Sequence, residues 1–139
     1  MATYNKFQQF VEDLAEKVHN LQTDILTVAL TAAANVPLAT NTVLANLTQI
    51  AYTNLSARAI TTSTSAQTTG TYKLVLADLV LTASGAVATF RYVVIYNDTP
   101  TSPADPLIAW YDYGSDVTLA SGETFTIDFD GTNGFLQIA

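Results

Sequence analysis

TYKLVLADLVLTASGAVATFRYVVIYND, residues 71–98, is dominated by Val, Leu, Ile, Phe and Tyr. These residue types suit a pleated, half-buried surface, so the segment predicts two long β-strands. Four residues, ASGA at 83–86, separate the strands, and Gly85 would supply the positive φ that a tight turn needs. We therefore expect an antiparallel hairpin at the centre of the fold.

Both faces of this predicted hairpin are apolar. Leu74 and Val75 point to opposite faces of the first strand, as Val93 and Val94 do in the second. An antiparallel sheet with one solvated face would alternate apolar and polar residues more cleanly. We therefore expect protein on both sides. A second sheet would cover the inside, and either the N-terminal segment of the chain or a neighbouring molecule would cover the outside.

Strand signals recur at short intervals through the rest of the chain. TPTSPADP at 99–106 must be a loop because it holds three prolines. Residues 61–69, TTSTSAQTT, fit either a flexible loop or a Thr-rich edge strand. The predicted strands are about eight, at residues 24–31, 58–66, 71–82, 86–97, 107–113, 117–119, 124–130 and 135–138. Their number and spacing predict a mainly β fold, an antiparallel β-sandwich or jelly roll, in a single domain of residues 24–139.

Residues 5–19 predict an amphipathic helix within an N-terminal helical segment of residues 1–23. Asn5 is a suitable N-cap, and the acidic side chains fall on the opposite face from the apolar ones. The helix packs either on the chain's own sheet or on another subunit. A second, short helix is predicted at residues 42–50. The apolar stripe of the first helix consists of Phe7, Phe10, Val11, Leu14 and Val18.

The charge of the chain limits its classes of partner. The 139 residues include 12 acidic and 5 basic ones, a formal net charge of −7, and the basic residues are scattered. A phosphate backbone requires clustered cations, so we expect no nucleic-acid partner. The chain has no Cys, which excludes disulfides and Cys-ligated metals.

A long uncharged segment follows the N-terminal region. Arg58 is the sole charged residue between Ile25 and Tyr72. The segment is too apolar for a disordered tail, and it contains no run of membrane-spanning length, so we expect no membrane partner. It therefore lies against protein, either its own domain or in part another molecule. The acidic residues that follow Lys6 leave no signal-peptide core, so we expect the chain to be made and kept in a cytoplasm.

Few residues suggest catalysis or metal binding. His19 is the only histidine, so it cannot form a metal site alone, and we expect a capping or surface role. Residues 128–134, DFDGTNG, have the alternating oxygen donors of a calcium loop but lack the terminal acidic ligand of an EF-hand. The same residues are typical of a hairpin turn. We expect no enzyme activity, no catalytic residue, no cofactor and no metal.

One aromatic cluster suggests a ligand. Trp110, Tyr111 and Tyr113 follow the Pro-rich loop and could stack on a sugar ring, with Asp112 or Asp116 binding its hydroxyls. Aromatic residues in strands often lie in the core with a polar tip at its boundary, so a purely structural role fits the same residues.

Three stretches of the chain carry a resemblance to a known family. They are TYNKFQQFVEDLAEKVHNL at 3–21, FRYVVIYND at 90–98 and LIAWYDYGSDVTLASGETFTIDF at 107–129. Together they resemble small virion proteins of tailed bacteriophages, among them the capsid decoration or cement proteins. Those proteins fold as jelly rolls and clamp neighbouring major capsid subunits on an HK97-type head.

The resemblance implies a non-enzymatic structural role on the outer surface of a phage capsid, with assembly in the host cytoplasm. It implies the major capsid protein as partner, and self-association as a dimer or trimer. The contacts would be made by the predicted helix, at Phe7, Phe10, Val11 and Leu14, and by the uncharged residues 25–70.

Two alternatives use the same fold class. A phage fibre or surface module would bind host carbohydrate through Trp110, Tyr111 and Tyr113. A separate β-sandwich with a small-molecule ligand is the weaker alternative, because the sequence shows no convergent polar groups.

Overall fold

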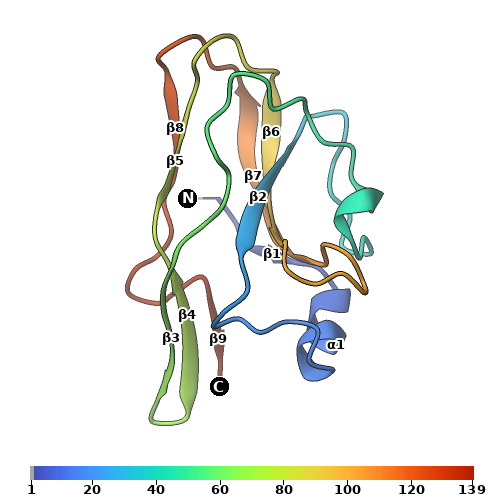
Figure 1. Cartoon of the computed structure of the whole chain (residues 1–139), viewed down its shortest axis with the longest axis vertical. Coiled ribbons are helices and arrows are strands. Elements are labelled where there is room, and N and C mark those ends of the chain that lie inside the picture. Colours follow the sequence, from blue (N-terminus) through green and yellow to red (C-terminus); the bar gives the residue numbers. More distant parts are fainter. Residues whose placement is uncertain (1) are drawn as a thin grey trace.

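The computed structural model describes residues 2–139 and shows two facing layers of antiparallel strands (Figure 1). Strands make up 42% of the chain and helices 7%. The prediction of a mainly β, antiparallel sandwich is therefore confirmed, whereas its jelly-roll form stays a prediction.

Four strands form the first layer, in the spatial order β1 (Asn5–Lys6), β7 (Leu107–Val117), β6 (Phe90–Asn97) and β2 (Leu26–Thr31). The central strand, β6, is buried along nearly its whole length. It pairs with β7 on one side and with β2 on the other. The strands predicted at 107–113 and 117–119 prove to be one strand, β7, in which Gly114 has a φ of 92°.

Two smaller sheets form the second layer. One holds β3 (Thr62–Thr68), β4 (Thr71–Leu76) and β9 (Leu136–Ile138), and the other holds β5 (Leu79–Thr82) and β8 (Thr124–Ile127). The Thr-rich segment is thus an edge strand, which was one of the two predicted alternatives. Asp78 joins the two sheets, because its Oδ1 accepts a hydrogen bond of 2.9 Å from the backbone N–H of Phe129.

The prediction that residues 71–98 form a hairpin is wrong. β5 and β6 belong to opposite layers, and residues 83–89 cross between them (Figure 1). Alternating apolar residues give the same pattern in a hairpin and in a crossing between two buried sheets, so the pattern could not distinguish them. Gly85 does not have a positive φ. It is needed for close packing instead, because a Cβ there would lie 2.7 Å from Asn54 Nδ2.

Both faces of the first layer are covered, as predicted, and the chain itself supplies both covers. On the inner face, Ile95 packs in the large core between the layers. On the outer face, Val94 packs in a second apolar cluster with Phe7, and Leu44 and Leu47 pack against this cluster. A neighbouring molecule is therefore not required to shield the central strand.

The N-terminal helix is shorter than predicted. Helix α1 spans Gln9–Ala15, because the two residues of β1 pair with β7 at the edge of the first sheet. Asn5 is therefore not the N-cap, and Gln8 occupies that position. The helix predicted at 42–50 is reduced to one 3₁₀ turn, η1 (Leu44–Asn46).

Much of the uncharged segment packs on its own domain. Residues 50 and 58–60 close the edge of β2, with the N–H of Ile60 donating to the carbonyl of Leu26 at 2.8 Å, while the N–H of Ser56 donates to the carbonyl of Thr82 in β5. Arg58 lies over the ring of Tyr52, with Cζ 3.6 Å from the ring centroid, and donates to a backbone carbonyl of β2. Arg58, the only charged residue of the segment, therefore makes its contacts within the chain's own fold.

Candidate functional site

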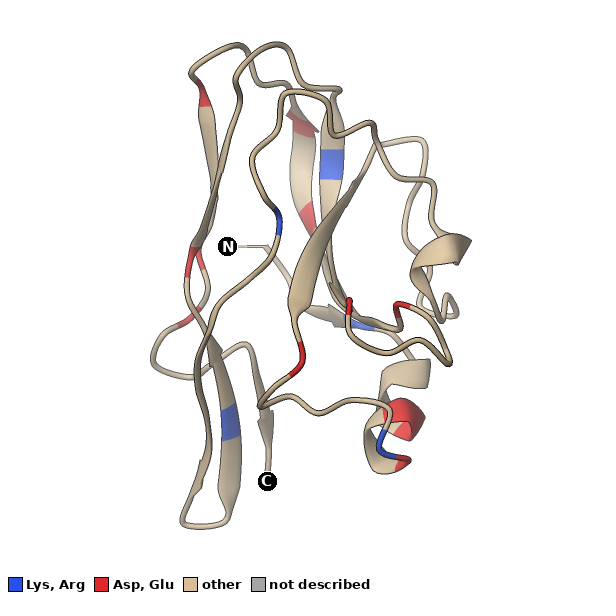
Figure 2. Cartoon of the chain, in the orientation of Figure 1, with Lys and Arg blue, Asp and Glu red and all other residues tan. Residues whose placement is uncertain are grey.

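Three exposed apolar side chains lie on α1 and on the loop that follows β2. Val11, Val36 and Leu38 expose 52%, 51% and 58% of their surface. We call these three residues the loop–helix surface. The loop, residues 32–41, carries no charged side chain, and Figure 2 shows none from the end of β2 to Arg58. Exposed apolar surface that is contiguous commonly marks an interaction site, whereas single exposed apolar residues are normal.

The two segments of the loop–helix surface meet at a backbone hydrogen bond. The N–H of Gln8, at the start of α1, donates to the carbonyl of Ala39 at 2.9 Å. Within the loop, the N–H of Asn41 donates to the carbonyl of Leu38 at 2.9 Å, and the N–H of Leu38 donates to Asn41 Oδ1 at 2.8 Å. These hydrogen bonds constrain the loop, while Val36 and Leu38 are exposed to solvent. The helix and the uncharged segment, predicted separately as contact surfaces, are joined at this point.

Two of the four predicted contact residues of the helix face inward. Phe7 is fully buried with its ring centroid 4.6 Å from that of Trp110, and Phe10 is buried against His19 with a centroid distance of 5.2 Å. Leu14 is half-buried against the core, and Val11 is exposed. Phe7 and Phe10 thus pack on the chain's own sheet, which was one of the two predicted alternatives, and neither side chain is exposed to a partner in this structure. Both side chains are needed to cover the first layer, which the periodicity alone did not reveal.

The predicted aromatic platform is divided between the two faces of β7. Trp110 packs with Phe7 on the outer face, whereas Tyr111 packs against the core on the inner face. Tyr113 shares the inner face, because side chains alternate along a strand. Asp112 lies on the outer face, and Asp116 is exposed. The three rings therefore do not form a single surface.

Tyr111 and Tyr113 instead line a cleft between the layers, with a volume of about 610 Å³. Tyr4 lies across it, with its ring centroid 5.9 Å from that of Tyr111 and 5.5 Å from that of Phe135. Tyr113 packs edge-to-face on Phe125 at 5.3 Å. Sequence reasoning missed Tyr4, Phe125 and Phe135 as partners, because they come from the N-terminal arm, from β8 and from the segment before β9.

The polar groups of this aromatic cleft are phenols and carboxylates. Burial raises the pKa of Tyr4 to about 12, and burial, together with the neighbouring Tyr4, also raises the pKa of Tyr111. Both phenols are therefore neutral hydrogen-bond donors at physiological pH. Asp128 and Asp130 also line the cleft.

The calcium-like loop at 128–134 is folded as a turn. Both oxygens of Asp130 accept hydrogen bonds of 2.8 Å, from the backbone N–H groups of Thr132 and Asn133 and from the side-chain amide of Asn133. These bonds lower the pKa of Asp130. Within residues 2–139, no group of three or more His, Cys, Asp or Glu side chains is arranged to hold a metal ion.

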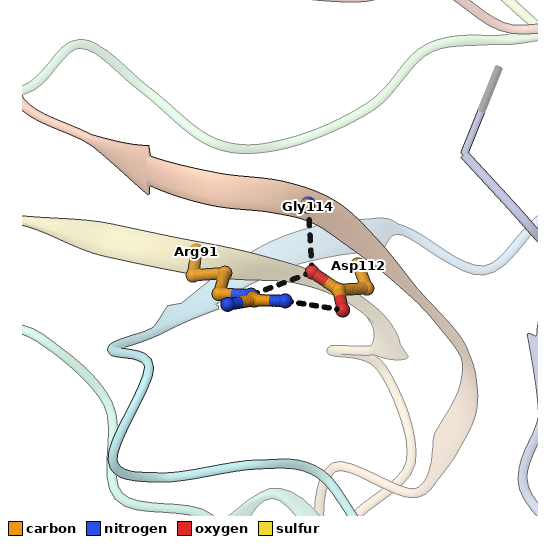
Figure 3. Close-up of polar contacts among 3 residues, drawn as sticks. All are labelled: Arg91, Asp112 and Gly114. Atoms are coloured by element: carbon orange, nitrogen blue, oxygen red, sulfur yellow. Dashed lines mark hydrogen bonds and ion pairs between the residues drawn. The ribbon is translucent and has the colours of Figure 1, made fainter.

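Asp112, a predicted sugar-binding residue, is paired with Arg91 (Figure 3). Arg91 donates from Nε to Oδ1 at 2.8 Å and from its terminal nitrogen to Oδ2 at 3.0 Å, and the N–H of Gly114 donates to Oδ1 at 2.8 Å. The hydrogen bond from Arg91 and that from Gly114 lower the pKa of Asp112. The carboxylate is thus occupied in joining β6 to β7.

His19 belongs to a buried polar cluster. The side-chain amide of Asn97 donates to Asp24 Oδ2 at 2.7 Å and lies 3.1 Å from His19 Nδ1. Asn97 Oδ1 accepts from the N–H of Thr99 at 3.1 Å, which fixes the orientation of the amide. His19 Nδ1 is therefore an acceptor, and the proton of the neutral ring is on Nε2. Burial lowers the pKa of His19, while Asp13 and Asp24 partly oppose this shift.

Comparisons with protein-family models, with curated proteins and with solved structures found no match. In the described part of the chain, no helix has the length and hydrophobicity of a membrane span. The fold is an antiparallel β-sandwich with exposed apolar side chains on α1 and on the uncharged loop after β2, and with a separate aromatic cleft. Because a sandwich of this kind serves many roles, function must be inferred from these two sites.

Proposed function

We propose that the protein is a non-enzymatic structural component of a tailed-phage virion that binds the outside of the capsid and stabilises the shell by bridging major capsid subunits. The loop–helix surface is the observation that supports this proposal most strongly. Its three apolar side chains are about half exposed, its loop part carries no charge, and a backbone hydrogen bond ties the loop to α1, where the exposed Glu12 lies next to Val11. This combination suits a surface that becomes buried in an assembly.

The binding free energy expected from this surface suits a contact that is repeated many times in an assembly. Removing the three half-exposed side chains from water would contribute roughly 1 kcal/mol each. One such contact is weak, but a symmetric shell repeats it at every copy, and binding to the assembled state alone stabilises that state by mass action. Because the loop is uncharged, its burial carries no penalty for desolvating ions.

The test compares charged variants at matched positions. Val36→Asp and Leu38→Asp each place one negative charge on the loop–helix surface. Val80→Asp places the same charge on a β5 side chain that is 50% exposed. Each variant is mixed with purified heads that lack the protein, and bound protein is measured after sedimentation. We expect both loop variants to bind at least about tenfold more weakly and Val80→Asp to bind like wild type. Undiminished binding of both loop variants would contradict this surface.

The aromatic cleft favours a second candidate function, the binding of host carbohydrate. A pyranose has an apolar face that stacks on aromatic rings, and its hydroxyls match phenol donors and carboxylate acceptors. Tyr111 and Tyr113 supply rings to this cleft, whereas Trp110 lies on the other face of β7. If glycan arrays give a ligand, Tyr113→Ala should abolish its binding and a folded Trp110→Ala should retain it. Loss with Trp110→Ala alone would contradict this cleft as the site.

A further inference from the structure

The β3–β4 hairpin has one free edge. β3 pairs only with β4, on the side away from β9, and in Figure 1 the hairpin extends beyond the rest of the molecule. No backbone hydrogen bond from elsewhere in residues 2–139 reaches residues 63–68. The outward N–H and C=O groups of β3 are therefore open to another strand.

The register identifies the groups that face outward. Thr69 and Gly70 form the turn, and both have positive φ, 50° and 85°, as in a type I′ turn. Thr68 and Thr71 flank this two-residue turn and bond to each other across the hairpin. Bonded residues alternate along an antiparallel strand, so Ser65 and Gln67 direct their backbone groups to the free edge.

The other outer strand edges in the described chain are shorter or covered. β1 has two residues, β9 has three and β8 has four. Backbone hydrogen bonds from residues 50 and 58–60 cover β2, and one from Ser56 reaches β5. β3 has seven residues, TSTSAQT, with none of the prolines or charged side chains that usually protect an exposed edge. A shift in register between Thr62 and Thr64 interrupts its start, so residues 64–68 are its regular unprotected edge.

We propose that β3 pairs antiparallel with β3 of a second copy of this chain, around a twofold axis near Ser65. Ser65 would face its own counterpart, and the two three-stranded sheets would join into one of six strands. The resemblance to decoration proteins implied self-association without a surface; this inference names the surface from the strand edge alone and does not depend on the capsid role.

The distribution of charge favours a second copy as the occupant. Two chains of net charge −7 repel each other, so their contact must avoid acidic residues. Residues 61–72 carry no charge, and the next residue, Lys73, lies on β4 behind the free edge. A strand that lies antiparallel to itself is also self-complementary, as a twofold contact requires.

Sedimentation velocity of the full chain, from micromolar to near-millimolar concentration, tests the proposal. We expect a reversible monomer–dimer equilibrium, because an interface of one strand pair is small. Ser65→Lys and Gln67→Lys, each checked for folding by circular dichroism, should remain monomeric at every concentration. Ser115→Lys, at an exposed position of β7, should dimerise like wild type. A second readout is hydrogen exchange, in which the amides of Ser65 and Gln67 should gain protection at high concentration.

Two results would overturn the proposal. One is a wild-type chain that stays monomeric over the whole range. The other is a folded Ser65→Lys or Gln67→Lys variant that dimerises as well as Ser115→Lys. Either result would leave the capsid proposal intact, because head binding is measured separately.

Discussion

The backbone N–H of Gln8 donates a hydrogen bond of 2.9 Å to the carbonyl of Ala39. This bond ties the start of α1 to the uncharged loop, so that Val11 and Leu38 extend from connected segments. Neither residue packs in either core cluster. The loop–helix surface is therefore a feature of tertiary structure, and no continuous segment of the sequence contains it.

Phe7 and Val11 should respond oppositely to substitution. Phe7→Ala should lower the free energy of unfolding by about 3–5 kcal/mol, because Phe7 is fully buried against Trp110. Val11→Ala should change it by no more than about 0.5 kcal/mol, because the side chain is half exposed. Urea unfolding measures both values. Equal losses from the two substitutions would contradict the inward position of Phe7.

The β3–β4 turn should be improved by Asn. Thr69 has a φ of 50°, which a β-branched residue adopts at a cost, whereas Asn-Gly is the preferred pair for a type I′ turn. Thr69→Asn should raise the free energy of unfolding by about 0.5–1 kcal/mol, and Gly70→Ala should lower it by about 1 kcal/mol. A Thr69→Asn protein less stable than wild type would argue against this turn.

Substitution by Ala at Gly134 and at Gly131, two glycines of the same loop, should have different effects on stability. Gly134 has a φ of 86°, and a Cβ there would lie 2.8 Å from the carbonyl oxygen of Leu74. No atom lies within 4 Å of a Cβ at Gly131. Gly134→Ala should cost at least about 2 kcal/mol, because left-handed strain and a backbone clash add. Gly131→Ala should stay within about 0.5 kcal/mol of wild type in the same thermal unfolding assay.

Acid should destabilise the fold through His19. Its pKa in the folded chain lies below the ordinary 6.5, so the folded state binds fewer protons than the unfolded state. The stability from neutral His19 is complete above the ordinary pKa and is lost as the pH falls through it toward the lower folded pKa. The slope cannot exceed about 1.4 kcal/mol per pH unit, the value for one proton.

His19→Gln provides the control, because the chain has no other histidine. The difference in free energy of unfolding between wild type and His19→Gln should shrink or reverse as the pH falls from about 7.5 to about 5.5. A difference that is constant over this range would show that His19 is not held neutral by the fold.

The local pattern of residue types predicted the fold class but not the order in which the chain visits the two layers. β-branched and aromatic residues in short runs indicated the strands, and three prolines indicated the loop after β6. The crossing between β5 and β6 was predicted as a hairpin. Strands in two packed sheets and strands in one sheet that is covered on both faces show the same pattern of apolar residues. The helix was predicted too long, because the pairing of Asn5 with Trp110 depends on a strand distant in sequence.

The candidate sites were predicted in part. The uncharged segment was recognised, but only the fold separates residues 50–60, which bond to β2 and β5, from the exposed loop. Tyr111 and Tyr113 were recognised as aromatic candidates, but their partners Tyr4 and Phe125 come from distant elements. Such contacts arise from packing, which no local pattern encodes.

The central claim, capsid binding, is tested most directly by adding the purified protein to phage heads that lack it. Sedimentation measures the bound protein, and the decorated and bare heads are then heated. The proposed role predicts saturable binding at a fixed ratio to the major capsid subunit, and survival of the decorated heads to a higher temperature. Protein that stays in the supernatant at every ratio, with no change in the heat resistance of the heads, would contradict it.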